Sequence, residues 1–177
     1  MKNAWTVLCL CLMGALSSVG CTSGPQPYNV EISIHTASGD FRENFPSLDV
    51  DLIPVSAGEA PEWEHAVSNY YDGESSESRH RDLWIEDKRM ATISFRPDQR
   101  TPPGLKYDDP LWNSRIAAGA THLIVMTNLE IVREGDSNRR RTKLPLDYDC
   151  WKTDTIQIRI TDIGIDVTTR PLPCEEE

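Results

Sequence analysis

Hydrophobic residues alternate with polar ones in several short runs of this chain, a pattern typical of half-buried β-strands. Such runs occur at residues 30–34 and 48–52. Two further strands are predicted at residues 90–95, which are rich in apolar and β-branched side chains, and at residues 139–146. We expect the second strand to end by Pro54. Residues 121–132 are instead apolar on both faces, which predicts a central strand that is covered on both sides.

The last hairpin of the chain can be given a register. Ile158 and Ile160 alternate with polar residues, residues 161–164 have turn composition, and Ile165 and Val167 resume the alternation. Pairing Ile160 with Ile165 and Ile158 with Val167 places all four side chains on one face. We therefore predict a closing hairpin over residues 153–169.

Two segments have the spacing of helices. Pro61 suits a first helical turn, and the apolar residues after it recur on one face as far as Tyr70. Asp109 begins a second short helix that ends at Gly119. Residues 74–81 are polar and predict a loop. Seven or eight short strands with two short helices predict a mainly-β protein, a small two-layer β-sandwich such as an Ig-like one.

The N-terminus has the pattern of a bacterial lipoprotein signal. Lys2 provides a positive charge, residues 4–16 are almost purely apolar, and Cys21 follows small residues. The apolar run of about 13 residues is shorter than the roughly 20 needed to span a bilayer. Ser18 departs from the usual leucine, which leaves an ordinary signal peptide as the alternative, with Cys21 incidental.

Cleavage before Cys21 would leave about 157 residues, enough for one domain with a real core. The chain then divides into a signal peptide, a lipidated tether, a single β-sandwich domain and an acidic tail, at residues 1–20, 21–27, 28–174 and 175–177. Thr22 follows the cysteine, where an aspartate would favour retention in the inner membrane. We therefore expect a lipid anchor in the outer membrane, on its periplasmic face, or in the cell membrane of a bacterium without an outer membrane.

The chain is acidic, with a formal net charge of −10. Lys2 is the only charged residue of the signal, so the mature chain would carry about −11. This charge disfavours nucleic acid and anionic lipid surfaces as partners.

Two of the five cysteines remain once the signal is cleaved and Cys21 is lipidated. These are Cys150 and Cys174, and an oxidising compartment favours a disulfide between them. Extending the hairpin register brings Cys150 opposite residue 175, so a bulge that absorbs one residue would bring the pair within bridging distance.

The sequence contains no convergent set of catalytic residues and no pair of histidines at metal-ligand spacing. We therefore predict no enzyme activity, no metal and no cofactor. The one basic cluster, Arg139 to Arg141 with Lys143, is more typical of a solvated strand end than of a binding patch. Phe41 and Phe45, with Arg42 between them, lie in a polar loop where they could anchor a partner or fold back over the sheet.

Residues 45–52, with the sequence FPSLDVDL, resemble the proline-led second strand of the outer-membrane lipoprotein family of the type VI secretion membrane complex. Residues 120–125, ATHLIV, are similar to a buried strand of that family. The resemblance implies a transthyretin-like sandwich. It also implies that the chain anchors the periplasmic part of an inner-membrane partner through the loop after the first strand, here residues 38–46.

Our leading hypothesis is a lipid-anchored, non-enzymatic binding or scaffold module of the bacterial cell envelope, with an envelope protein as partner. The alternative is a solute- or glycan-binding lipoprotein in which Tyr107, Trp112 and residues 96–109 line a pocket. An envelope hydrolase is the third hypothesis and would need a clustered acid, base or nucleophile.

Overall fold

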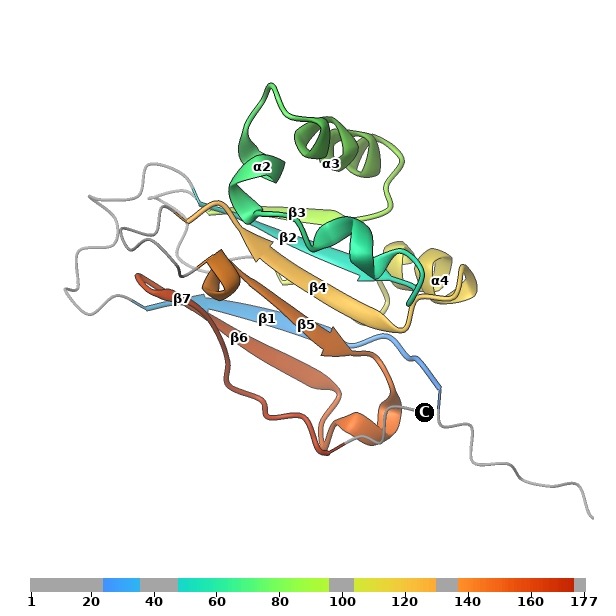
Figure 1. Cartoon of the computed structure of the whole chain (residues 1–177). Helices are drawn as coiled ribbons and strands as arrows, with labels where there is room; N and C mark the ends of the chain where they lie inside the picture. Colours follow the sequence, from blue (N-terminus) through green and yellow to red (C-terminus); the bar gives the residue numbers. More distant parts are fainter. Residues whose placement is uncertain (1–23, 36–47, 96–103, 130–136, 174–177) are drawn as a thin grey trace, which may run out of the picture.

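The computed structural model describes residues 24–35, 48–95, 104–129 and 137–173 (Figure 1). These residues form seven strands in two sheets, together with three α-helices and three short 3-10 helices. The mainly-β class and the sandwich arrangement predicted from the sequence are confirmed.

Four antiparallel strands make the larger sheet, in the order β3, β2, β4, β5. Their bounds are Ala91–Phe95, Leu48–Val55, His122–Thr127 and Arg141–Pro145, respectively. β4 lies between two neighbours, and every residue after His122 in it is buried. The predicted central strand is therefore confirmed, with its end at Thr127.

The second strand does not stop before Pro54, as the sequence suggested, but continues through it to Val55. β3 pairs with β2 only as far as Leu52, so beyond that point β2 has β4 as its one neighbour. A proline lacks an N–H, and it is tolerated here because its nitrogen needs no partner on the open side.

Three strands make the smaller sheet, in the order β1, β6, β7. Their bounds are Asn29–Ile34, Thr155–Thr161 and Gly164–Val167. β1 runs parallel to β6, whereas β6 and β7 form an antiparallel hairpin. Ile158 lies opposite Val167 and Ile160 opposite Ile165, which confirms the predicted register.

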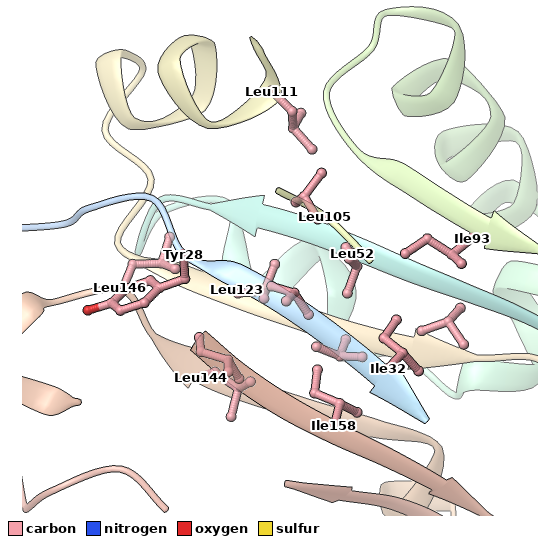
Figure 2. Close-up of a cluster of buried hydrophobic side chains, with 14 of the residues drawn as sticks. Tyr28, Ile32, Leu52, Ile93, Leu105, Leu111, Leu123, Leu144, Leu146 and Ile158 are labelled. Atoms are coloured by element: carbon pink, nitrogen blue, oxygen red, sulfur yellow. The ribbon is translucent and has the colours of Figure 1, made fainter. Parts of the chain in front are cut away.

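The main hydrophobic core lies between the two sheets (Figure 2). Ile32 and Ile158 enter it from the smaller sheet, and Leu52 and Leu123 enter it from the larger one. The helix α4 (Pro110–Ala117) closes one end with Trp112, whose side chain has no exposed surface. The predicted start of this helix is confirmed, because the Asp109 side chain accepts a hydrogen bond from the N–H of Leu111 at 2.9 Å.

A layer of helices covers the outer face of the larger sheet (Figure 1). It consists of η1 (Ala60–Trp63), α2 (Val67–Tyr71) and α3 (Ser76–Glu86), which together we call the helical cap. The cap buries a second core of ten residues: Ile53, Val55, Ala60, Trp63, Val67, Tyr70, Trp84, Met90, Ile124 and Met126. Across the described part of the chain, no helix has the length and apolar character needed to cross a membrane.

Two predictions about this layer are wrong. The continuous helix expected from Pro61 to Tyr70 is a 3-10 turn and a separate short α-helix. A loop is expected at residues 74–81, but residues 76–81 of it form the first part of α3. Only Ser78 and Trp84 of α3 are buried, so this helix lacks the apolar stripe by which a sequence pattern predicts a helix.

Candidate functional site

The domain has two opposite ends, which are set by the direction of β1. At the first, which we call the tether end, the chain enters from the N-terminus alongside η3 (Tyr148–Cys150) (Figure 1). Pro25 forms a β-bridge with Asp147, and the N–H of Tyr148 donates to the carbonyl of Gly24 at 3.4 Å. The chain is therefore attached to the domain from Gly24 onward.

At the second end, which we call the far end, β1 stops and the turn between β6 and β7 lies beside it (Figure 1). The N–H of His35 donates to the carbonyl of Ile160 at 2.8 Å. Phe41, Arg42 and Phe45 lie outside the described residues. The segment that carries them joins His35 to Leu48, and both of these residues are at the far end.

The two sheets are fixed to each other at the far end by a close backbone approach. Gly164 has a φ of +138°, and a Cβ there would lie 2.4 Å from the carbonyl oxygen of Arg139. Only glycine satisfies both conditions, because it has no side chain and tolerates positive φ. The hairpin of the smaller sheet therefore rests directly on η2 (Ser137–Arg140), which precedes β5.

The basic cluster predicted near residue 140 does not form one charged surface. Arg141 donates to the carbonyl of Trp63 at 2.5 Å and to that of His65 at 2.9 Å. Arg140 donates to the carbonyl of Leu129 at 3.3 Å. Arg140 and Arg141 thus bind carbonyl groups of other segments, and Arg141 links β5 to the helical cap. Lys143 is exposed.

A buried carboxylate fixes the helical cap to the central strand β2. Asp51 has no exposed surface. Its two oxygens accept from the Arg81 guanidinium at 2.6 and 3.0 Å. They also accept from the Tyr71 hydroxyl at 2.9 Å and the Thr92 hydroxyl at 2.7 Å. These bonds match the acceptor capacity of a carboxylate, so the buried charge of Asp51 has both a cation and a full set of donors.

Burial and the charge of Asp51 set the protonation of its two titratable neighbours, Tyr71 and Arg81. Burial raises the pKa of Tyr71 well above its ordinary value, and the negative charge of Asp51 raises it further. Burial alone would lower the pKa of Arg81, but its hydrogen bond and attraction to Asp51 raise it overall. Tyr71 is therefore a neutral donor and Arg81 a permanent cation.

A second polar cluster lies at the base of the cap. Glu59 accepts from Arg89 at 2.5 Å and from Arg115 at 2.6 Å. Burial raises the pKa of Glu59, but hydrogen bonds from Ser56 and the charge of Arg115 outweigh this and lower it overall. Both guanidinium groups also lie over the ring of Trp84, at 3.8 Å for Arg89 and 5.0 Å for Arg115.

Neither cluster is predicted by the sequence. Asp51 alternates with apolar residues, a pattern typical of a side chain that faces solvent, whereas it faces the helical cap. The one local signal for α3 is Ser75, whose side chain accepts from the N–H of Ser78 at 2.9 Å and caps the helix. The partners of Arg81 are distant in sequence, so no local pattern reveals them.

The remaining predicted sites divide between the described residues and the rest of the chain. Cys21 and Cys174 lie outside the described residues. Cys150 is buried, and its carbonyl accepts from the N–H of Leu172 at 2.8 Å. The described residues contain no group of three His, Cys, Asp or Glu side chains that could hold a metal ion. The alternative hypothesis placed Trp112 in the wall of a pocket. Its side chain is instead buried in the main core.

Comparison with models of protein families gives no match, and comparison with curated proteins gives none either. The similar solved structures include the following two. One is Lip of Serratia marcescens, a membrane-bound component of the type VI secretion system, with 12% identity and a TM-score of 0.38 over 86% of this chain and 99% of that chain. The other is the type VI secretion lipoprotein TssJ1 of Pseudomonas aeruginosa, with 16% identity and a TM-score of 0.38 over 83% and 99%, respectively. Both solved structures are of type VI secretion system proteins.

Proposed function

We propose that this chain is a lipid-anchored, non-enzymatic binding module of the bacterial cell envelope. A lipid on Cys21 holds it in the outer membrane, on the periplasmic face. The segment of residues 38–46 then binds an envelope protein through Phe41, Arg42 and Phe45. The resemblance of residues 45–52 to the type VI secretion lipoproteins supports a secretion complex as the assembly that is anchored.

The separation of the two ends carries this proposal. The proposed lipid would be linked to the domain through Gly24 at the tether end, and the chain leaves β1 at His35, at the far end, before the partner segment of residues 38–46. β1 joins these ends directly, and its six residues span about 20 Å. A partner bound at the far end would thus be held at a fixed distance from the membrane, as expected of an anchor.

The lipid attachment is tested by replacing Cys21 with Ser in the full chain. We expect the variant to move from the membrane fraction to the soluble periplasmic fraction, and mass spectrometry of the wild-type N-terminal peptide to find an acylated Cys21. Ser18→Leu is the matched control, because it restores the usual residue of such signals and should retain processing. A wild-type chain that is cleaved without acylation would contradict the proposal.

The partner segment is tested with Phe41→Ala and Phe45→Ala combined. We expect the double variant to lose at least about tenfold in capture of the envelope partner, because aromatic anchors dominate interface energies. Leu83→Ala with Ile85→Ala is the control, since both residues are exposed on α3, at 57% and 38%, and lie outside the proposed site. Equal capture by the aromatic variant and the wild type would exclude this segment as the binding site.

A further inference from the structure

Two exposed tyrosines are gathered at the tether end. The large hydrophobic side chains exposed in the described part of the chain are Leu83, Ile85, Tyr107, Tyr148 and Ile163. The two aromatic ones, Tyr107 at 59% and Tyr148 at 53%, both adjoin the segment that leads in from the N-terminus. Leu83 and Ile85 belong to the helical cap, and Ile163 lies in the far-end turn between β6 and β7.

The backbone of both tyrosines is held in place by that same N-terminal segment. The N–H of Tyr148 donates to the carbonyl of Gly24, and the N–H of Tyr107 donates to the Asn29 side chain at 3.2 Å. Just before Tyr107, Leu105 exchanges two backbone hydrogen bonds with Val30, at 2.7 and 3.0 Å. The backbone of each tyrosine is therefore tied to the entering chain, that of Tyr148 at Gly24 and that of Tyr107 at Asn29.

The length of chain before Gly24 brings these points close to the membrane. Only three peptide steps separate Cys21 from Gly24, and they span at most about 11 Å when fully extended. A lipidated cysteine lies at the level of the lipid headgroups, a zone of about 5–7 Å on each side of the hydrocarbon core. Tyr148 adjoins Gly24, so its ring is within reach of that zone.

We infer that the tether end is a membrane-contact surface, in which Tyr148 and Tyr107 enter the headgroup region of the bilayer that holds the lipid of Cys21. The inference rests on the proposed lipid anchor. Tyrosine suits this position because its ring is apolar, whereas its hydroxyl can hydrogen-bond to water or headgroups. It is enriched at membrane interfaces for that reason. A lipid and two aromatic contacts give three points of attachment, which define the orientation of the domain.

The charges at the tether end disfavour an anionic lipid surface. The charged side chains near the two tyrosines include Lys106, Asp108, Asp147, Asp149, Lys152 and Asp154. Because aspartates outnumber lysines there, the surface is net negative, and the contact that we infer is with zwitterionic phospholipid. We therefore expect the contact to depend on the tyrosine rings and to be insensitive to salt.

Fluorescence quenching by brominated lipid tests the orientation. Trp is introduced as Tyr148→Trp, as Tyr107→Trp and, for comparison, as Ile163→Trp in the far-end turn, where Ile163 is 57% exposed. The full chain is processed in cells, and the mature protein is reconstituted into phosphatidylcholine vesicles that contain brominated acyl chains. The four tryptophans of the described residues are at most 5% exposed, so the added Trp dominates the quenchable signal.

We expect the Trp at positions 148 and 107 to be quenched at least about twofold more strongly than the Trp at 163, because interfacial aromatic rings lie at headgroup depth. Raising the salt concentration should not change this ratio. Acylated protein that floats with the vesicles but is quenched equally at 148 and 163 would overturn the membrane-contact surface and leave the anchor intact. Absence of acylation by mass spectrometry would instead overturn both. If Tyr107→Trp fails to fold by circular dichroism, the comparison of 148 with 163 decides.

Discussion

Arg81 in the helical cap donates two hydrogen bonds to Asp51 on strand β2, and the carboxylate that it meets has no contact with solvent. This ion pair joins the layer of helices to the sheet at a point where apolar packing alone would be expected. The surrounding hydroxyls of Tyr71 and Thr92 complete the shell of the carboxylate.

Breaking this pair from one side should be costly. Arg81→Met would leave the charge of Asp51 buried without its cation, and we expect a loss of about 3–5 kcal/mol in the free energy of unfolding. Denaturant titration measures this loss. Adding Asp51→Asn to the variant removes the buried charge and should recover part of the stability.

Arg159→Met is the matched control for this prediction. Arg159 pairs with Asp166, but the two side chains are 41% and 50% exposed. An exposed pair contributes about 0–1 kcal/mol, so this variant should remain close to the wild type. Equal losses in the two arginine variants would show that the burial of Asp51 has no energetic consequence.

Gly164→Ala should destabilise the contact between the two sheets. The added Cβ would lie 2.4 Å from the Arg139 carbonyl at a φ of +138°. We expect a loss of about 2 kcal/mol or more, since strained backbone alone costs about 1–3 kcal/mol. Gly73→Ala, where a Cβ meets nothing within 4 Å, serves as the control and should change the midpoint of thermal unfolding little.

The stability of the fold should decrease in acid partly through Glu59. Its pKa in the folded state lies below its ordinary value of 4.5, so its contribution is present above that pH and is lost as the pH falls through the folded pKa. Glu59→Gln should therefore flatten the decrease in unfolding free energy below about pH 4.5. Urea titrations of both proteins from pH 7 to pH 3 measure the difference, and parallel pH profiles would contradict it.

Reduction should destabilise the mature protein if Cys150 and Cys174 are bonded, as we predict. Closing a loop of this length is worth about 3 kcal/mol by the chain-entropy account. The position of Leu172, whose N–H reaches the carbonyl of Cys150, supports the pairing. Mass spectrometry after non-reducing digestion tests it, and recovery of two free thiols would exclude it.

The sequence predicts those elements whose stability comes from nearby residues. The hairpin of β6 and β7 follows from alternating isoleucines on both sides of one turn. The helix α4 follows from Asp109 and Pro110 at its start. In each case the residues that specify the element are only a few positions apart.

The sequence does not predict α3 or the parallel pairing of β1 with β6. α3 is held by Arg81 and Trp84, whose partners come from several other segments of the chain. For β1, the alternation of its residues shows which face is buried but not which strand lies beside it. The same limit applies to Asp51. The sequence pattern of a strand is the same whether water or a helix covers the face that carries its polar residues.

The pairing of β1 with β6 also sets the order of events when the protein is made. Asn29 lies opposite Thr155, so the first strand has no sheet partner until most of the chain has been delivered. If the chain is exported from its N-terminus, as the proposed lipid anchor requires, β1 would cross the membrane before its partner strand. Pro25 would then close against Asp147 only after most of the chain has followed. Under that proposal, late folding of β1 would leave Cys21 accessible to the enzymes that cleave the signal and attach the lipid.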